Sequence, residues 1–347
     1  MKPILCAVIC LVKGDPNMSE NLIEVTDLTK RFPVKKGLLG GMGKTQQFVH
    51  AVNHVNFTIK KGEVFSIVGE SGCGKSTTAR TLIRLYEPDE GKIIFDGTDI
   101  SHLTEAQLVP FRSKMQMIFQ NPYSSLNPRH TVKNIIAEPI LFHHLVKTRK
   151  EAEDIALSLL DKVGLHTEQA DRFPHQFSGG QRQRISIARA LALNPQFVIA
   201  DEPVSALDVS IQAQILNLLM DVKDEYHLSY LFIAHNLAVV KHISDRVGVM
   251  YLGTMVEVAE KNTIFASPIH PYTQALFASI PILGKPIGDP VITGDTPSTP
   301  IHLPEGCIFH NRCPFAKDIC KKIRPEMKEY DGGHFAACHM VEQGGHW

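Results

Sequence analysis

The sequence has little net charge of either sign. Lys and Arg together number 36, Asp and Glu also number 36, and the formal net charge over 347 residues is therefore zero. A protein that holds a nucleic-acid backbone usually carries a clear basic excess, which neutralises the phosphates. The composition therefore disfavours a nucleic-acid-binding protein, although a local basic patch would be invisible in the total.

Long apolar runs are lacking as well. The longest run near the N-terminus, residues 4–12, has nine residues, and no run in the chain reaches the roughly eighteen that a membrane-spanning helix needs. We therefore expect no transmembrane helix. The same run follows Lys2 and mimics a signal peptide, but no small-x-small cleavage site comes after it. We interpret residues 1–17 as a non-native or disordered extension, and we expect the natural chain to begin at Met18.

One stretch carries a strong phosphate-binding pattern. Residues 69–76 read GESGCGKS, after the largely apolar, strand-like run 64–68 and before helix-tolerant residues. Glycines let backbone N–H groups turn toward a phosphate, the lysine reaches the β- and γ-phosphates, and the following hydroxyl can bind Mg²⁺. Such a pattern arises by chance in glycine-rich loops, but the strand and helix around it argue against chance. The sequence therefore predicts a nucleoside triphosphate site with Lys75 and Ser76 at the phosphates, and Cys73 as a tolerated small residue.

Alternating apolar residues predict strands before the phosphate-binding loop. They occur over residues 21–28 and 51–60, on either side of a glycine-rich stretch, and residues 91–97 predict one more strand and turn. An aromatic residue upstream of a P-loop can stack on adenine, and Phe32 is best placed for this, with Phe48 second. Packing within the sheet is an equally open role for Phe32.

The pattern changes after residue 103. Residues 116–120 are strand-like, residues 121–129 (NPYSSLNPR) are loop-like, and helical periodicity then dominates up to residue 175. Apolar residues keep a helical period over residues 149–164, where a glycine provides the stop. We expect a mostly helical insertion inside an α/β domain.

Ser178 begins the sequence SGGQ. Ser178 and Gln181 have the spacing of a capping box, so a helix is expected to begin there and to run to about residue 193. A helix N-terminus with exposed glycine N–H groups is an anion site. An ordinary capped helix that binds nothing is the alternative, and SGGQ taken alone fits it better.

Two further strands end in polar residues. Residues 197–200 are apolar and lead into Asp201 and Glu202, as in a buried parallel strand that delivers carboxylates to the sheet edge where P-loop ligands lie. Asp201 would hold Mg²⁺ through water, and Glu202 would polarise the attacking water. Residues 230–234 form a second predicted strand, which ends in His235. This histidine either has a structural role or bonds the γ-phosphate.

These segments together resemble the ATP-binding cassette (ABC) family over about residues 21–280. The resemblance rests on an ordered set of motifs: the P-loop at 69–76, Gln120, SGGQ at 178–181, Asp201-Glu202, SALD at 205–208 and His235. One departure is Phe177, which replaces the usual leucine before SGGQ and is expected to pack rather than to coordinate. The resemblance implies an α/β fold: a P-loop NTPase (RecA-like) core with an N-terminal antiparallel β-subdomain, a helical subdomain at about 103–180, and an ABC ATPase domain over 18–280.

The resemblance also implies roles for single residues. Gln120 would sense Mg²⁺ and water, Glu202 would be the general base and His235 the γ-phosphate ligand, with Lys75 completing the catalytic set. The residues expected to hold ATP within the same chain are Phe32, Gly69, Ser71, Gly72, Cys73, Gly74, Lys75, Ser76, Thr77, Gln120 and Asp201. The residues expected to hold Mg²⁺ are Ser76, Gln120 and Asp201.

The SGGQ motif implies a dimer of cassettes. By resemblance, Ser178, Gly180 and Gln181 would close on the ATP that the opposing subunit holds, and Asp208 would lie in the subunit contact. Each motif occurs once in this chain, so the second cassette must come from another molecule. Importers of this type resemble heterodimers, which makes a paralogous ABC ATPase subunit the expected partner.

Residues 267–276 (SPIHPYTQAL) narrow the resemblance to the ATPase subunits of oligopeptide, dipeptide and nickel importers. This implies an ATP-hydrolysing translocase subunit that powers uptake of di- or oligopeptides, located peripherally at the cytoplasmic face of the inner or plasma membrane. The implied partners are two transmembrane permease subunits, which residues 121–129 would touch, and indirectly an extracytoplasmic peptide-binding protein, with no nucleic acid. Whether the cargo is a dipeptide, a longer peptide or nickel is decided by other subunits.

The C-terminal extension, expected over residues 281–347, begins with a proline-rich connection at 281–305. Four of the chain's seven cysteines then follow in the spacing C-x5-C-x6-C-x17-C: Cys307, Cys313, Cys320 and Cys338. In a chain that otherwise looks cytosolic, such a group favours a metal site over disulfides.

The kind of metal site is less sharply defined by the spacing. Zinc sites usually have close C-x2–4-C pairs, which this tail lacks. Looser spacing fits an iron–sulfur cluster, and the family resemblance implies a [4Fe–4S] centre. Zinc, or no metal at all, remains open, and His310, His334 and His339 lie near enough in sequence to join a mixed ligand set.

Two other classes of function are compatible with parts of the sequence. A soluble ABC ATPase that acts in DNA repair or translation would share the nucleotide motifs, but such proteins tend to carry two cassettes, long coiled-coil insertions or basic patches, and none is visible. A redox sensor or cluster carrier would make the cysteine tail the main functional part. Co-purification with hydrophobic permease subunits would distinguish the importer subunit from both.

Overall fold

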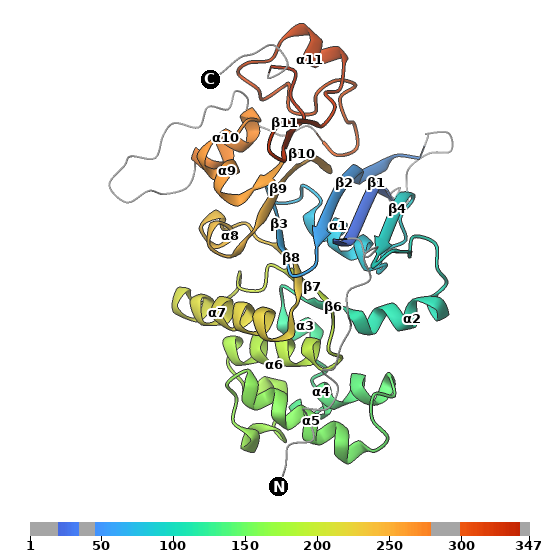
Figure 1. Cartoon of the computed structure of the whole chain (residues 1–347), viewed down its shortest axis with the longest axis vertical. Coiled ribbons are helices and arrows are strands. Elements are labelled where there is room, and N and C mark those ends of the chain that lie inside the picture. Colours follow the sequence, from blue (N-terminus) through green and yellow to red (C-terminus); the bar gives the residue numbers. More distant parts are fainter. Residues whose placement is uncertain (1–19, 35–45, 279–298, 341–347) are drawn as a thin grey trace, which may run out of the picture.

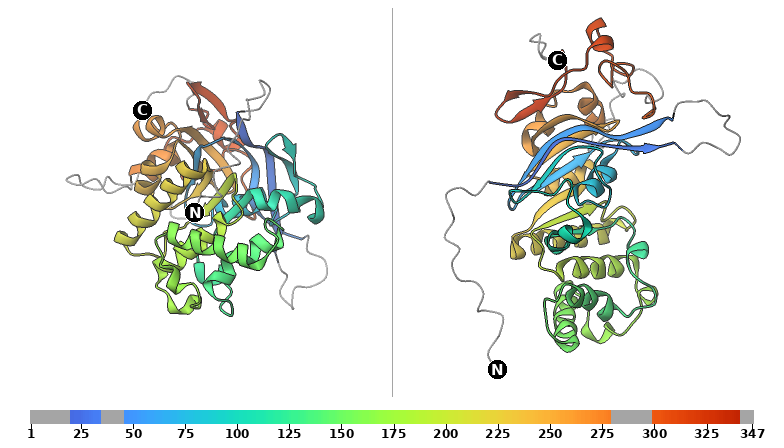
Figure 2. Two further views of the ribbon diagram at one scale, coloured as in Figure 1. Left: turned by 60° about the horizontal axis from the view of Figure 1, so that its bottom comes forward. Right: turned by 90° about the vertical axis from the view of Figure 1, so that its right-hand side faces the viewer.

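The computed structural model describes residues 20–34, 46–278 and 299–340. The predicted N-terminal extension, and residues 281–298 of the proline-rich connection, lie outside this range. The C-terminal segment lies at one end of the long axis, helices α4 (Val132–Phe142) and α5 (Arg149–Lys162) lie at the other, and the sheets lie between them (Figures 1 and 2). No helix among the described residues is long and apolar enough to cross a membrane.

A four-stranded antiparallel sheet is formed by the N-terminal part of the chain. Its strands, in spatial order, are β2 (Phe48–Lys60), β1 (Asn21–Pro33), β4 (Glu90–Phe95) and β5 (Thr98–Asp99). These strands confirm the predicted ones, and β1 runs further than expected, through Phe32. Ile23 and Val25 on β1 are buried because this face packs on the central sheet, where Phe65 and Ile67 belong to the same apolar cluster.

The described residues form a central sheet of eight strands. Its parallel strands are β6 (Met115–Ile118), β7 (Phe197–Asp201), β8 (Ser229–Ile233), β3 (Val64–Val68) and β9 (Arg246–Tyr251). Antiparallel strands extend it to the order β11-β12-β10-β9-β3-β8-β7-β6: β10 (Thr254–Glu260), β12 (His334–Ala336) and β11 (Lys328–Asp331). Every residue of β3, β7 and β8 is buried, and each strand is apolar apart from a single polar residue: Ser66, Asp201 and Ser229 respectively.

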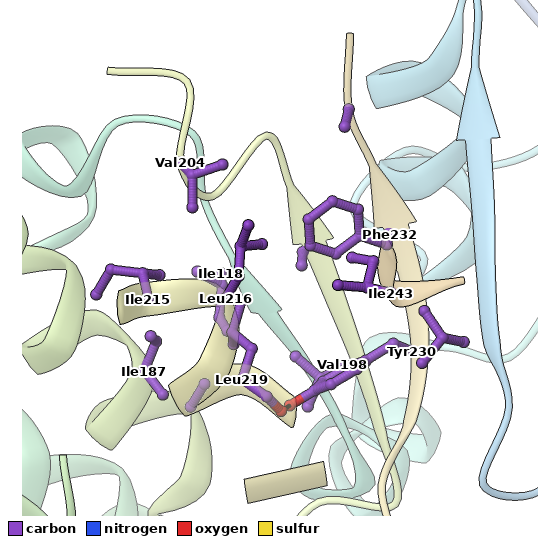
Figure 3. Packing of buried hydrophobic residues seen from close by; sticks show 14 of the residues in the cluster. Ile118, Ile187, Val198, Val204, Ile215, Leu216, Leu219, Tyr230, Phe232 and Ile243 are labelled. Carbon is purple, nitrogen blue, oxygen red and sulfur yellow. Dashed lines mark hydrogen bonds between the residues drawn. The ribbon is translucent and has the colours of Figure 1, made fainter. Parts of the chain in front are cut away.

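Alternate residues of the parallel strands contribute to two buried clusters, one on each face of the sheet. Phe197 and Ile199 of β7 pack toward the antiparallel sheet. Val198 packs on the other face, where α6 (Gly179–Leu191) and α7 (Val209–Tyr226) supply apolar side chains such as Ile215 (Figure 3). Because both faces are covered, the strand ends are the part of the central sheet that is open to a ligand.

Smaller helices complete the fold. They are α1 (Lys75–Leu82), α2 (Glu105–Lys114), α3 (Pro122–Ser125), α8 (Leu237–Ile243), α9 (Lys261–Ala266), α10 (Pro271–Ala278) and α11 (Asp318–Lys322), with 3-10 turns at Thr167–Gln169 and Pro174–Gln176. Helix α3 corrects the expectation of a loop over 121–129: the Asn121 side chain accepts a hydrogen bond from the N–H of Tyr123 and a proline occupies the first turn, which together start a short helix.

The predicted helical insertion is confirmed. Helix α5 begins after a capping box formed by Thr148 and Glu151, and it ends close to Gly164, as the periodicity indicated. Helix α6 begins after the capping box of Ser178 and Gln181. Phe177 is 4% exposed and packs in the larger apolar cluster, which confirms its expected packing role.

The C-terminal segment is part of the central sheet. Strand β12 pairs with β10 through Glu257 opposite Ala336 and Val258 opposite Phe335. The buried carboxylate of Glu257 accepts hydrogen bonds from the N–H groups of Ile269 and His270, and one of its oxygens lies 2.7 Å from Nε2 of His334. One buried side chain therefore links β10, the approach to α10 and the tail.

Candidate functional site

The P-loop joins the end of β3 to the start of α1. Three of its glycines have positive φ angles: 152° at Gly69, 77° at Gly72 and 106° at Gly74. A Cβ atom on Gly74 would lie 2.1 Å from the carbonyl oxygen of Ala51, and one on Gly69 would lie 2.1 Å from that of Met250. Only glycine fits these two positions, so the loop can wrap closely and direct backbone N–H groups inward.

Lys75 and Ser76 follow the loop at the first turn of α1. The ammonium of Lys75 is buried and donates hydrogen bonds of 2.9 Å to the carbonyl oxygens of Gly69 and Glu70. The hydroxyl of Ser76 donates to Oδ1 of Asp201 over 2.8 Å. A lysine thus lies along the loop, and two oxygen groups of the kind that Mg²⁺ prefers lie side by side.

Asp201 ends β7 and is 1% exposed. Burial raises the pKa of this carboxyl, while the Ser76 hydrogen bond and the positive charge of Arg80 oppose that rise. The guanidinium of Arg80 lies 3.7 Å from Oδ2 of Asp201. The Asp201 carboxylate beside the Ser76 hydroxyl provides oxygen ligands of the kind that a divalent cation takes.

Two other predicted site residues, Gln120 and His235, lie beside the carboxylate of Glu202. Its Oε2 atom accepts a hydrogen bond of 2.7 Å from Nε2 of Gln120, and Nδ1 of His235 lies 3.4 Å from the same oxygen. Glu202 has a φ of 47°, in the left-handed region that is uncommon for residues with a side chain. The backbone therefore turns sharply after β7 and presents this carboxylate beside Gln120 and His235.

Lys75, Ser76, Gln120, Glu202 and His235 line one cavity of about 550 Å³, and Asp201 lies behind its wall. Its lining residues are Phe32, Val49, Ala51, Ser71, Gly72, Gly74, Lys75, Ser76, Thr77, Gln120, Glu202, His235 and Pro300. Phe32 lines the cavity and also makes an edge-on contact with Tyr86 at 5.3 Å, so the adenine-stacking and packing roles predicted for it are both compatible with its position. Phe48, the second candidate, does not line the cavity.

Six residues predicted to hold nucleotide do not line this cavity. Gly69, Cys73 and Asp201 lie behind its wall, and Ser178, Gly180 and Gln181 lie elsewhere in the chain. The hydroxyl of Ser178 accepts a hydrogen bond from the Gln181 N–H, and the Ser178 side chain is exposed at the start of α6. Asp208 is exposed at the start of α7, next to Val209, which is 82% exposed.

The cavity also has lining residues that the sequence did not reveal. Val49 and Ala51 come from β2, where their alternation signals only a strand. Pro300 comes from the C-terminal segment, and its carbonyl oxygen accepts a hydrogen bond of 2.8 Å from the N–H of His50. This contact joins positions far apart in the chain, and no local pattern predicts it.

The four C-terminal cysteines converge on a second, small cavity. Its lining includes Cys307, Cys313, Cys320 and Cys338 together with His270, His310 and His339. Burial raises the pKa of the Cys307 thiol to about 12, and the neighbouring thiols contribute in the same direction. Burial likewise raises the pKa of Cys313 to about 11. None of the cysteines in the described part of the chain forms a disulfide.

The arrangement of these thiols bears on the metal expectation. Among residues 20–34, 46–278 and 299–340, no group of three or more His, Cys, Asp or Glu side chains is arranged to hold a metal ion. The four cysteines therefore lie around one cavity, but the described side chains are not arranged to hold a single metal ion. The suggestion that His334 could join the cysteines as a ligand is corrected. His334 does not line the cavity, because its Nε2 atom lies 2.7 Å from the buried carboxylate of Glu257.

Comparison with known proteins identifies the family. The ABC transporter sequence model matches residues 52–205, and the model of the oligopeptide/dipeptide transporter C-terminal region matches residues 256–320. The chain is 53% identical over 326 residues to the oligopeptide transport ATP-binding protein AppF of Bacillus subtilis, which spans 92% of this chain and 98% of AppF. The chain belongs to the ABC transporter ATP-binding proteins.

Other ABC proteins extend the comparison. The dipeptide transport ATP-binding protein DppF of Escherichia coli is 46% identical over 332 residues, which cover 95% of this chain and 97% of DppF. Among solved structures, the dimeric post-hydrolysis state of the ATP-binding cassette MJ0796, bound to ADP and Pi, has a TM-score of 0.61 and 30% identity. That match covers 69% of this chain and 98% of the cassette, and it confirms the predicted cassette fold.

Proposed function

We propose that this ABC protein is the ATP-hydrolysing subunit of an importer of di- or oligopeptides. The observation that carries the proposal is the convergence of Lys75, Ser76 and Glu202 on one cavity, in a chain whose C-terminal region matches the oligopeptide/dipeptide transporter model. The names of AppF and DppF support peptides as the cargo. They do not favour the alternative of a soluble ATPase in DNA repair or translation.

The same-chain half of the ATP site consists of the P-loop and the walls around it. The backbone N–H groups of the loop and the ammonium of Lys75 bind the β- and γ-phosphates, and Lys75 exchanges part of its bonding to loop carbonyls for phosphate oxygens. Phe32 provides a ring for adenine. Ser76 and Asp201, with Gln120, hold Mg²⁺, which neutralises charge on the phosphates when bound.

Glu202 is assigned as the general base. Its carboxylate lines the cavity, and both Gln120 and His235 approach the same carboxylate oxygen, Oε2. Gln120 orients the carboxylate and the attacking water, Glu202 accepts a proton from that water, and His235 donates a hydrogen bond to the γ-phosphate. The chain positions these groups without forming a covalent bond to the substrate.

A second cassette completes the site. The exposed Ser178 at the N-terminus of α6, with Gly180 and Gln181, reaches the γ-phosphate held by a partner cassette, which is a paralogous subunit. The exposed side chains of Asp208 and Val209 lie in the same interface. A Ser178→Ala variant should therefore lower phosphate release at the partner's site, and an own-site defect with a normal partner site would contradict this assignment.

The helical insertion at about 103–180, called the helical lobe from here on, is assigned as the surface that meets two transmembrane permease subunits. A groove of about 540 Å³ opens there, lined by residues that include His130, Glu138 and Phe142. Phe142 is 69% exposed and Tyr123 is 63% exposed, so both rings present apolar area that a permease subunit would cover. The chain would be held at the cytoplasmic face of the membrane through this contact, with the extracytoplasmic peptide-binding protein reached only through the permeases.

The cysteine cavity is assigned to a [4Fe–4S] cluster. Four thiols line one small space, and four cysteine thiolates are the ligand set that a [4Fe–4S] cluster takes. When bound, the cluster would supply cross-linking of the tail through four Fe–S bonds. Iron and sulfide analysis of anaerobically purified protein tests this: a Cys338→Ser variant should lose both, a Cys73→Ser control should keep both, and a wild-type chain free of iron and sulfide refutes it.

The function is tested by reconstituting the chain in vesicles with its partner cassette, its permease subunits and the peptide-binding protein, and measuring uptake of a labelled dipeptide. Uptake should require ATP and should be abolished by Lys75→Ala. A matched control is Lys92→Ala, which changes a lysine on β4 that does not line the ATP cavity. Dipeptide uptake without ATP, or equal uptake with Lys75→Ala, would contradict the proposal.

A further inference from the structure

The P-loop carries a carboxylate that is bound from outside the nucleotide site. Glu70 lies in the loop, and its two carboxylate oxygens accept two hydrogen bonds of 3.0 Å from the guanidinium of Arg312. The side chain of Arg312 is 11% exposed and that of Glu70 is 33% exposed. Such a two-point contact fixes the orientation of a carboxylate more strictly than a single contact does.

Arg312 rests on a platform of buried rings. Its guanidinium also donates to the hydroxyl of Tyr251 over 3.4 Å, and it lies 6.0 Å from the ring centre of Phe309. The ring of Phe309 contacts Tyr251 at 5.3 Å and Tyr272 at 5.5 Å. All three rings are almost fully buried, so the arginine side chain has little freedom to leave Glu70.

The same platform holds the backbone of Glu70. The N–H of Glu70 donates to the hydroxyl of Tyr272 over 2.9 Å. On the other side, the carbonyl oxygen of Glu70 accepts a hydrogen bond from Lys75. Glu70 is therefore held at its N–H, its carbonyl and its carboxylate, and two of these three contacts come from residues C-terminal to β10.

A carboxylate in a loop that binds a triphosphate needs an explanation, because like charges repel. Arg312 neutralises Glu70 and draws it toward the tail. We propose that Arg312 is a positioning residue for the P-loop: it holds Glu70 so that the loop keeps its phosphate-binding shape and the carboxylate does not oppose ATP. Because Arg312 directly precedes Cys313, the cysteine segment is mechanically joined to the nucleotide site.

The test is a double-mutant cycle on the full-length chain, read as the dissociation constant of a fluorescent ATP analogue. It rests on the proposed function, since ATP must bind at the P-loop. Arg312→Met should weaken binding about fivefold, the size expected for a two-point, partly buried ion pair, and Arg312→Lys should restore part of the loss. Glu70→Gln should weaken binding less, because it leaves no negative charge in the loop to repel the phosphates, and the charge that loses its partner, the guanidinium of Arg312, is positive.

The double variant separates positioning from a general structural effect. Arg312 acts only through Glu70, so adding Arg312→Met to Glu70→Gln should leave the dissociation constant within about twofold of Glu70→Gln alone. Amide hydrogen exchange of residues 69–74 without nucleotide should rise in Arg312→Met. A control, Arg324→Met, changes a tail arginine that bonds the carbonyl oxygen of Pro304, and it should leave both measurements unchanged.

Each outcome is decisive. If Arg312→Met binds like the wild type, or if the two substitutions have additive effects, the positioning role is refuted. If Arg324→Met matches Arg312→Met, the effect is a general one of the tail and the positioning role is also refuted. If the wild-type chain itself binds no ATP analogue, the proposed function fails instead.

Discussion

Removing the buried carboxylate of Glu257 should detach the C-terminal segment from the central sheet. Glu257 is fully buried and accepts hydrogen bonds from the N–H groups of Ile269 and His270, at 2.7 and 2.8 Å. Its third partner is His334 of the tail, at 2.7 Å. Glu257→Ala leaves the two N–H groups and His334 without this partner. At about 1–3 kcal/mol for each of the two N–H groups, the free energy of unfolding should fall by about 2–6 kcal/mol.

Two measurements check this prediction. Urea unfolding followed by circular dichroism gives the loss of stability, and native-state hydrogen exchange over residues 328–340 reports whether the tail strands open locally. Glu260→Ala is a matched control at the exposed end of the same strand, and it should cost less than about 0.5 kcal/mol. If Glu257→Ala unfolds like the control, with unchanged exchange in the tail, the account of how the tail is anchored is wrong.

Three further predictions concern the nucleotide site. Gly74→Ala should abolish ATP binding in an equilibrium titration, because the new methyl would lie 2.1 Å from the carbonyl oxygen of Ala51, and normal binding would contradict the loop geometry. Phe32→Ala should weaken ATP binding about tenfold while Phe48→Ala leaves it unchanged, and equal effects would argue against adenine stacking on Phe32. Burial raises the pKa of the Cys73 thiol, so iodoacetamide at pH 7.5 (about neutral) should leave Cys73 unlabelled in peptide mass spectra, and rapid labelling would refute its burial.

Much of the nucleotide site could be predicted from the sequence because its signals are local. The P-loop is a contiguous pattern, and the strands ending at Asp201 and before His235 are short apolar runs between turns. Parallel strands bring their carboxyl ends to one edge, so Glu202 and His235 were expected there, and they lie 3.4 Å apart; Gln120, whose role the family resemblance implied, lies 2.7 Å from Glu202. The capping box of Ser178 is likewise a local signal.

The connection between the tail and the cassette could not be predicted in this way. Strand β12 is three residues long, too short to show a periodicity, and its partner β10 lies far away in the sequence. The contact of Arg312 with Glu70 joins residues 242 positions apart. Such pairs depend on the packed structure, because each side chain taken alone resembles an ordinary surface charge.

The helical lobe contains one helix that the sequence predicted and one that it did not. The period over 149–164 predicted α5 because its buried side recurs every turn. The short helix α3 was missed because two prolines near it resemble a loop, although Asn121 supplies a cap and Pro122 suits a first helical turn.

The role proposed for Glu202 is to activate water for attack on ATP bound in this cavity. The most direct test compares wild-type and Glu202→Gln chains, each purified with its permease subunits, by measuring ATP binding and release of inorganic phosphate from the same samples. The amide keeps the shape of the side chain but cannot accept the proton, so binding should stay within about twofold while phosphate release falls by about a hundredfold or more. Phosphate release at the wild-type rate from Glu202→Gln would contradict the account.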